Sequence, residues 1–417
     1  MKGYLKPVLI SVVALCLLPG NAKAANDTLY SFDARDFSKK TWEWKGDILI
    51  TATSKQLDRK SVLYAVKYPG EEPSQITELE SQLTLESRWD WDWSRLILAG
   101  RTMAHRSDLD GADTEESVLT EGYWQFSALD PHNGEIGKRL LRWGKGYAFN
   151  PVAFLERVKN PEDPEDSREG LWMVQGIWIP GGFSIFDNSS LNLVYLPIRQ
   201  DLNDDFVTRP TESEDWGLRL YTLVGTADFD LYIVQKQDTH ETDWGFDFAA
   251  NVTPSFEVHG EYASIDSDDT ASYQAFLLGA RYLTENDVTW IMETYHNSSG
   301  LTEKESTALF ASAHSGSATA LRQLVSLTQK SRTLNQNYAY LKASIKEPFD
   351  WLYFTPSMAW LVNLDDSSAN MNLQLTYTPA SNWLFQTSWQ HLAGETHTQY
   401  GEGIVQDKIV LEAGYSF

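Results

Sequence analysis

The sequence predicts an all-β fold, a transmembrane antiparallel β-barrel of about 18 strands, with 16 as the alternative, short periplasmic turns and long external loops. Three observations lead to this prediction. Apolar and polar residues alternate along many segments of about 9 to 14 residues, the length that a tilted membrane strand needs. The joints between these segments are alternately short and long. The chain also contains 16 Trp, 19 Tyr and 18 Phe, although 22% of its residues are charged.

The alternation is clear in the segment 382–390. Trp383, Phe385 and Trp389 share one face, and Gln386 and Ser388 lie on the other. Such a period of two, with polar residues on the second face, describes a strand with one dry side and one wet side. A solvent-exposed sheet of a soluble protein has the same pattern, so the prediction of a membrane barrel depends on the number and spacing of the segments.

Nineteen segments qualify as candidate strands. They lie at 41–53, 57–68, 76–89, 92–105, 115–127, 137–147, 171–180, 190–199, 214–223, 226–237, 240–251, 254–264, 271–283, 286–296, 335–345, 349–363, 366–377, 380–391 and 404–417. A single-chain barrel with both ends in the periplasm needs an even number. Counting back from Phe417, we expect 57–68 to be the first outward strand and 18 strands in all. The segment 41–53 is then an extra periplasmic element, or part of one divided first strand.

The amino-terminal residues 1–24 have the layout of a cleaved signal peptide. Lys2 and Lys6 precede an apolar core at 8–18, and Ala24 ends a small-residue cleavage site. We therefore expect 25–417 to form the mature barrel. The only cysteine, Cys16, lies in the signal, so the mature chain has no thiol chemistry. The net charge of −24 repels nucleic acid, and we expect no nucleic-acid partner.

The chain ends in KIVLEAGYSF, with Ile409, Leu411, Tyr415 and Phe417 on one face and Glu412 on the other. This alternation resembles the carboxyl-terminal signature of Gram-negative outer-membrane β-barrels. The resemblance implies a multi-pass barrel in the cell outer membrane, in contact with its lipid and lipopolysaccharide. It also implies that Tyr415 and Phe417 are the insertion signal read by the barrel-insertion machinery.

The segment 138–172 leaves the strand pattern and contains a loop of more than twenty residues. Long loops in compact folds are usually functional or disordered, and Phe149 and Phe154 give this one apolar side chains to pack. We expect 147–170 to fold into the lumen as a constriction; the alternative is a loop that covers the outer mouth. The candidate pore-lining cations are Arg139, Arg142, Lys145, Arg157, Lys159 and Arg168.

The stretch RWGKGYAFNP at 142–151, with REGLWMVQGIWIP at 168–180, resembles porin-like barrels of the alginate-export type and their uncharacterised relatives. The resemblance implies a channel for passive diffusion of small polar or charged solutes, with basic residues in the pore. The acidic balance of this chain suits a weakly selective or cation-tolerant channel better than a polyanion channel. A non-conducting structural or surface-interaction barrel is the alternative function.

An enzyme is the third hypothesis. His296 and Ser298 lie two residues apart at a strand end, as a base and a nucleophile would, and resemble the His-x-Ser motif of the outer-membrane phospholipase. No matching partner element follows, so we expect no enzymatic activity. The sequence contains no phosphate loop and no histidine cluster at metal-ligand spacing, so neither a cofactor nor a metal is expected. A homo-oligomer is compatible with this class of barrel.

Overall fold

The computed structural model describes residues 41–417 except 71–72, 110–112, 130–131, 167, 181–187, 200–201, 204–211, 267–270, 331 and 381. The predicted signal peptide, 1–24, lies outside the described residues. The strands of the first half are β1 (Trp42–Leu57), β2 (Gln75–Asp90), β3 (Ser94–Ser107), β4 (Asp113–Leu129), β5 (His132–Arg139), β6 (Leu171–Trp178), β7 (Asn188–Ile198), β8 (Ser213–Val224) and β9 (Ala227–Gln235). Those of the second half are β10 (Thr242–Thr253), β11 (Phe256–Ile265), β12 (Tyr273–Leu283), β13 (Val288–Asn297), β14 (Asn337–Ile345), β15 (Phe354–Asn363), β16 (Ala369–Ala380), β17 (Trp383–Ala393) and β18 (Val405–Ser416).

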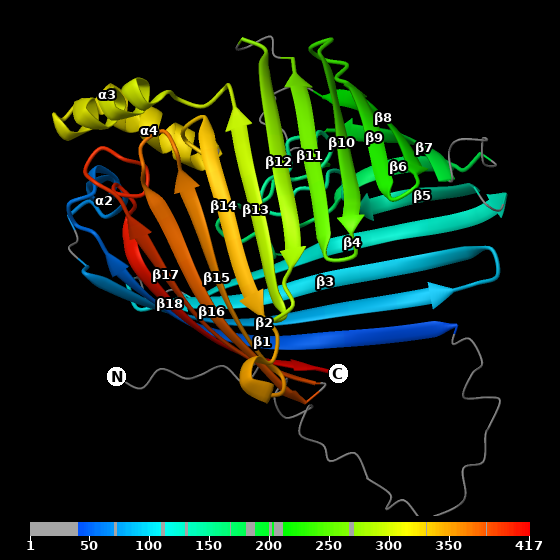
Figure 1. The fold of residues 1–417 in the computed structure, drawn as a ribbon, viewed down its shortest axis with the longest axis horizontal. Helices are drawn as coiled ribbons and strands as arrows, with labels where there is room; N and C mark the ends of the chain where they lie inside the picture. The colour runs from blue at the N-terminus through cyan, green and yellow to red at the C-terminus, as the bar shows by residue number, and fades with distance from the viewer. Residues whose placement is uncertain are drawn as a thin grey trace, which may run out of the picture. The chain divides into compact units, whose positions relative to one another are not determined.

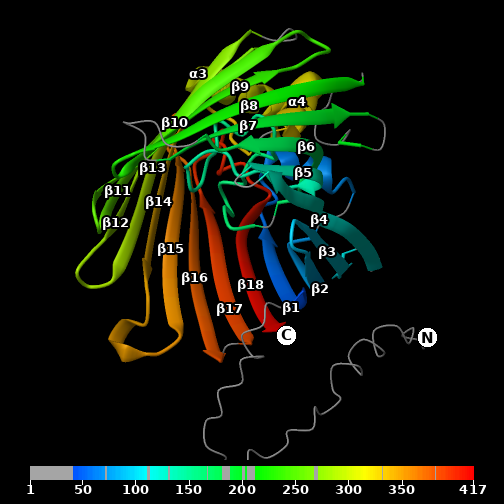
Figure 2. The ribbon, with the colours of Figure 1, turned by 90° about the vertical axis from the view of Figure 1, so that its right-hand side faces the viewer.

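These strands form one closed 18-stranded antiparallel sheet, which confirms the predicted fold class (Figures 1 and 2). Each strand pairs with the next in the chain, and β1 pairs with both β2 and β18. The last residue takes part in the closure. The N–H of Phe417 donates to the carbonyl of Gly46 over 2.8 Å, and the N–H of Gly46 donates to the carbonyl of Phe417 over 3.0 Å.

The alternation of the last strand separates its two faces as expected. Leu411 is 53% exposed on the outer face, in line with Ile409 and Tyr415. Glu412 points to the interior, where it accepts a hydrogen bond from Gln386 over 2.7 Å. Large apolar side chains are exposed in this way along most strands. Because such a surface is unfavourable in water, the outer face is suited to lipid.

The turns and the long connections lie at opposite ends of the barrel. The end that carries Phe417, here called the turn end, has connections such as 225–226, 254–255 and 284–287. The opposite end, here called the loop end, carries three helices, α2 (Val62–Lys67), α3 (Glu303–His314) and α4 (Ala318–Lys330) (Figure 1). Within the described residues, no helix is both long enough and apolar enough to cross a membrane.

The odd segment among the nineteen candidates is 57–68, and its prediction as the first strand was wrong. Residues 42–57 form β1, and 62–67 form the short helix α2. The Ser61 side chain caps this helix by accepting a hydrogen bond from the N–H of Leu63. Tyr64 packs against Leu57 and Ile76. The predicted total of 18 strands is confirmed, because 42–57 takes the place of 57–68 as the first outward strand.

The strand predicted at 137–147 also differs from the structure, in which β5 ends at Arg139. Glu121 on the neighbouring strand accepts a hydrogen bond from the N–H of Leu140, so the backbone leaves the sheet at this point. Gly137, with a φ of 134°, sits so close to the backbone of β4 that no side chain fits there. The chain re-enters the sheet only at Leu171.

The closure can be tested at Gly46. A Cβ atom at this position would lie 2.6 Å from Cζ of Phe417 and 2.9 Å from a methyl group of Leu85. We expect Gly46→Val to displace the Phe417 ring and to lower the unfolding free energy by about 1 to 3 kcal/mol. Gly176→Val is the matched control, because nothing lies within 4 Å of a Cβ there. Thermal unfolding of both variants can be followed by the change in electrophoretic mobility between the folded and the unfolded barrel. Equal midpoint temperatures for Gly46→Val and Gly176→Val would contradict the role of this contact.

Candidate functional site: a loop anchored across the barrel lumen

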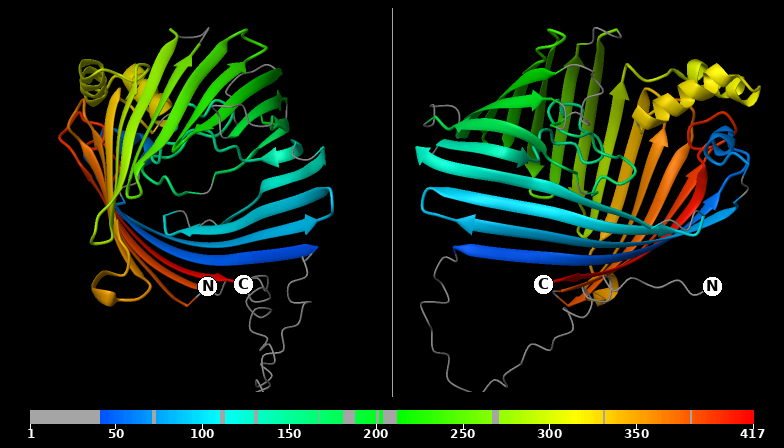
Figure 3. Two further views of the ribbon diagram at one scale, coloured as in Figure 1. Left: turned by 45° about the vertical axis from the view of Figure 1, so that its right-hand side comes forward. Right: turned by 180° about the vertical axis from the view of Figure 1, so that it is seen from behind.

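The segment 140–170 between β5 and β6, here called the lumen loop, lies inside the barrel (Figure 3). Its first apolar cluster joins Trp143, Val152 and Leu155 to the inner face of β6, β7 and β9, where Val194 and Tyr232 are fully buried. Its second cluster lies farther round the wall. There Phe149 stacks on Tyr295 with ring centroids 4.4 Å apart, and it also packs against Tyr338, Tyr340 and Leu361. The loop therefore contacts the wall from β6 to β15.

Two buried carboxylates of the wall hold the backbone of the loop. Glu261 of β11 accepts hydrogen bonds from the N–H groups of Lys145 over 2.6 Å, Gly146 over 2.5 Å and Val152 over 3.4 Å. Glu293 of β13 accepts from the N–H of Tyr147 and, over 2.8 Å, from that of Ala148. The two side chains are 3% and 2% exposed. A buried irregular segment must find partners for its backbone groups, and these carboxylates supply them.

The same carboxylates explain the glycines of this stretch. Gly144 has a φ of 88°, a left-handed conformation that favours glycine, and a Cβ there would meet the Glu261 carboxylate at 2.6 Å. A Cβ on Gly146 would collide with the carbonyl of Phe149. The Gly-Lys-Gly sequence thus lets three successive residues approach the wall closely. We infer that this requirement, rather than flexibility, places two glycines at 144 and 146.

A third buried carboxylate ties the loop to itself. Glu156 is 2% exposed, accepts a hydrogen bond from the N–H of Trp143 over 2.9 Å and pairs with Arg168 over 2.9 Å. Burial raises the pKa of Glu156 to about 7, although Arg168 and the Trp143 N–H oppose the shift. The outgoing and returning limbs of the loop are joined at this residue.

The six predicted pore cations all lie in this region, and five of them contact groups of the protein. Arg139 pairs with Glu121 and Glu135, Lys145 with Asp228 and Asp230, Arg157 with Glu169, and Arg168 with Glu156, whereas the Lys159 ammonium donates to the carbonyl of Gly146. Arg142 is exposed and has no ion-pair partner among the described residues. It therefore stays a prediction that these cations face a solute. Lys145, Lys159 and Arg168 fasten the loop, whereas Arg139 pairs with carboxylates of β4 and β5.

Three carboxylates of the barrel wall, Asp228, Asp230 and Asp247, form a compact cluster in which one oxygen of each lies within 4.8 Å of the others. The loop's own Lys145 places its ammonium 2.7 Å from Asp228 and 3.3 Å from Asp230. Arg219 approaches Asp230 at 2.8 Å. The charges of these carboxylates are thus balanced by two cations of the protein itself. Because Lys145 belongs to the lumen loop, the cluster is another point at which the loop is attached to the wall.

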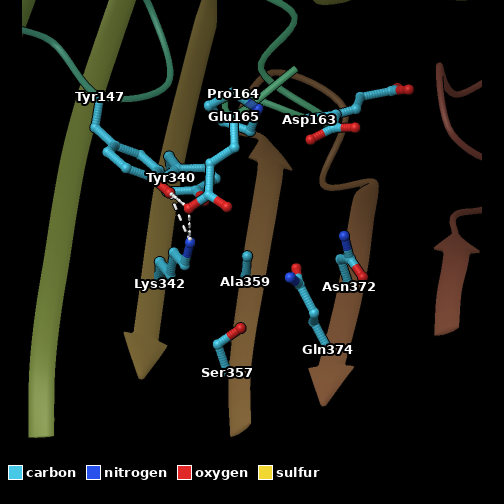
Figure 4. A pocket seen from close by; sticks show the side chains of 11 residues that line it. Tyr147, Asp163, Pro164, Glu165, Tyr340, Lys342, Ser357, Ala359, Asn372 and Gln374 are labelled. Carbon is cyan, nitrogen blue, oxygen red and sulfur yellow. Dashed lines mark hydrogen bonds and ion pairs between the residues drawn. The ribbon is translucent and has the colours of Figure 1, made fainter. Parts of the chain in front are cut away.

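The far tip of the loop is acidic, and its residues Glu162, Asp163, Glu165 and Asp166 are here called the acidic tip. Three of them, Glu162, Asp163 and Glu165, line a small open pocket whose opposite side is the inner wall formed by β14, β15 and β16 (Figure 4). The Lys342 ammonium contacts Glu165 and the Tyr147 hydroxyl, each over 2.6 Å. The remaining wall of the pocket offers neutral polar groups, among them Ser357, Asn372 and Gln374.

The wall beyond the pocket differs from the wall under the loop. The inward side chains of β17, β18, β1 and β2 are mostly polar and partly exposed, including Gln386, Glu412, Thr51, Glu80 and Gln82. By contrast, the wall under the apolar clusters is buried. The loop therefore covers one side of the inner wall and leaves a polar face on the other side.

His296 and Ser298, the pair behind the enzyme hypothesis, have different partners. The Nδ1 atom of His296 lies 2.8 Å from the amide oxygen of Asn337. The hydroxyl of Ser298 accepts a hydrogen bond from the N–H of Gln274 over 2.9 Å. Both side chains thus form hydrogen bonds with residues at the ends of neighbouring strands. The absence of enzymatic activity stays a prediction.

Sequence reasoning missed Glu261 and Glu293, the residues that fix the loop. Both occupy inward positions of alternating strands, where a carboxylate looks like part of a wet lumen face. Only their contacts with residues more than a hundred positions away in the chain distinguish them. The one local signal was the Gly-Lys-Gly stretch, which indicates a close backbone approach but not its partner.

We expect the double variant Glu261→Gln/Glu293→Gln to loosen the lumen loop without unfolding the barrel. Hydrogen bonds to charged groups contribute about 1.5 to 3 kcal/mol each, so exchange of the amides at 144–152 should accelerate by tenfold or more. Hydrogen exchange followed by mass spectrometry measures this. Glu86→Gln is the control, because this carboxylate pairs with Lys45 instead. Unchanged protection in the double variant would contradict the anchoring role.

The loop should also be held more tightly in acid. The raised pKa of Glu156 means that folding of the loop favours the protonated form, so this stability is present below about pH 4.5 and is lost as the pH rises through about 7. Proteinase K should therefore cleave the loop more slowly at pH 5 than at pH 8, after correction for protease activity. Glu156→Gln should reduce the difference without removing it, because burial also raises the pKa of Glu162 and of Asp163 in the same loop, and Glu169→Gln should leave it unchanged. An undiminished difference in Glu156→Gln would refute the assignment.

No family model matches the chain, and no curated protein matches it. Solved structures do match. Wzi, an outer membrane protein involved in group 1 capsule assembly in Escherichia coli and described as a carbohydrate-binding β-barrel, is 10% identical with a TM-score of 0.51, over 89% of this chain and 84% of Wzi. A mutant of the Rh. blastica porin is 10% identical with a TM-score of 0.43, over 90% of this chain and all of the porin. The likeness to Wzi confirms that the chain has the fold of an outer-membrane β-barrel.

Proposed function

We propose that the protein is a porin-like channel of the outer membrane that lets small polar solutes diffuse passively past the lumen loop. The observation that carries this proposal is the asymmetry of the lumen. The loop buries the wall from β6 to β15, whereas the inward side chains of β17, β18, β1 and β2 stay polar and partly exposed. A polar face of this kind is suited to water and dissolved solutes.

The charge at the constriction favours cations and neutral solutes over anions. The acidic tip contributes four carboxylates. Against them stand Lys342, which lines the adjacent pocket and pairs with Glu165, and Lys408 and Arg332, whose charges act on Glu162. Of the six predicted pore cations, five are engaged in the contacts described above. A net negative constriction raises the local concentration of cations and repels anions. This supports a cation-tolerant channel.

A second candidate is a non-conducting surface barrel. The observation that favours it is the attachment of the loop, whose backbone is held by two buried carboxylates and whose side chains pack in two apolar clusters. A loop fastened in this way could close the lumen permanently. Wzi, with a similar fold, is described as a carbohydrate-binding β-barrel. In this case the outer loops would contact a surface polymer, and no current would pass.

Planar-bilayer recordings of the refolded protein separate the two candidates. We expect ohmic steps and a reversal potential that favours cations in a salt gradient. Neutralising the tip with Glu162→Gln, Asp163→Asn and Asp166→Asn, which keeps the Glu165–Lys342 pair, should reduce the cation-to-anion permeability ratio about two- to fivefold, the effect of roughly 0.4 to 1 kcal/mol.

The charge-matched control is Asp113→Asn, Glu115→Gln and Glu116→Gln, three exposed residues at the loop end of β4. This triple variant should change the permeability ratio less than the variant of the acidic tip. Silence of the wild type, and of the variant with the loosened loop, would refute the channel and favour the non-conducting barrel. If current steps are observed but the substitutions in the acidic tip leave the permeability ratio unchanged, the acidic tip is not the constriction.

A further inference from the structure

The connection 346–353 between β14 and β15, here called the aromatic turn, exposes apolar side chains at the turn end of the barrel. Phe349 is 101% exposed, and Trp351, Leu352 and Tyr353 are 59%, 60% and 50% exposed. The connection contains a short helix, η2 (Pro348–Asp350), and projects from the barrel wall (Figures 1 and 2). It is longer than the neighbouring connections 284–287 and 254–255.

The backbone of the aromatic turn is held in unusual conformations. Glu347, Phe349, Asp350 and Tyr353 have φ values of 52°, 58°, 60° and 67°, all in the left-handed region. Such conformations cost about 1 kcal/mol or more in residues other than glycine. The turn is nevertheless closed by hydrogen bonds. The N–H of Glu347 donates to the carbonyl of Phe354 over 2.8 Å, and the Glu347 carboxylate accepts from the N–H of Tyr353 over 2.9 Å.

The exposed rings continue a surface that already faces outward. Trp351 stacks on Phe354 with centroids 4.4 Å apart, and Phe354 lies opposite Tyr377 in the sheet. Tyr377 is exposed on the outer face at the turn end. Around the barrel follow the exposed rings of Trp383, Phe385, Tyr415 and Phe417. The aromatic turn is thus a lateral extension of the outward aromatic band.

We propose that the aromatic turn is a lipid-binding anchor, which inserts Phe349 and Leu352 into the interfacial region of the membrane leaflet at the turn end. Trp and Tyr rings prefer this region, where one edge is wet and the body is apolar. Lys346 and Asp350 are exposed beside the rings and can meet the polar headgroups. The strained backbone holds the apolar side chains outward for contact with lipid. This role is independent of conduction.

Site-directed spin labelling tests the anchor. Cys16, the only cysteine, lies in the predicted signal peptide, so the barrel of residues 25–417 gives a cysteine-free background for single labels. We expect a nitroxide at Phe349→Cys, in the barrel reconstituted into phospholipid vesicles, to collide with oxygen several times more often than with a water-soluble nickel chelate. Leu352→Cys should behave alike, which guards against an effect of removing Phe349 itself.

Two reference sites calibrate the measurement. A label at Leu411→Cys, on the outer face of β18, gives the value for a lipid-facing residue. A label at Ser255→Cys, in the tight turn between β10 and β11 at the same end, gives the value for water. Labels at 349 and 352 that match the one at 255 would overturn the proposal. Labels protected from both reagents would also overturn it, because protein would then cover the turn, as in an association of two copies.

Discussion

The rest of the structure depends on one constraint, that every backbone N–H and C=O group removed from water must be paired. In lipid an open sheet edge would leave a row of such groups unpaired, so β18 must pair with β1. The reciprocal hydrogen bonds between Gly46 and Phe417 carry the pairing to the last residue of the chain. The outward aromatic rings and the wet inner face follow once the sheet is closed.

The same constraint acts inside the barrel on the lumen loop. The stretch from Gly144 to Val152 is neither helix nor strand, so its N–H groups have no regular partners. Glu261 and Glu293 accept five of them, and each carboxylate would be costly to bury without those donors. The loop and the wall carboxylates are thus mutually dependent. Removal of either would leave unpaired groups in the interior.

Sequence alternation predicted the barrel well because lipid and lumen impose a strict period of two on every strand. It failed at 57–68, where Val62 and Leu63 pack against helices from a distant part of the chain, a contact that no local pattern reveals. The lumen loop and its cations could be located from their composition. Their partners could not be predicted, because Lys145 meets Asp228 and Asp230 only after β5 and β9 take their places in the sheet.

The anchoring of the loop limits how a solute could pass. Releasing the whole loop would break the hydrogen bonds to Glu261 and Glu293 and expose two apolar clusters at once, a cost of many kcal/mol that thermal motion at rest would rarely meet. Conduction by opening of the loop is therefore disfavoured. In the proposed channel a solute would instead move between the acidic tip and the polar strands β17, β18, β1 and β2 while the clusters stay packed. In that case, the packing that holds the loop against the wall would also keep the proposed passage at a constant width.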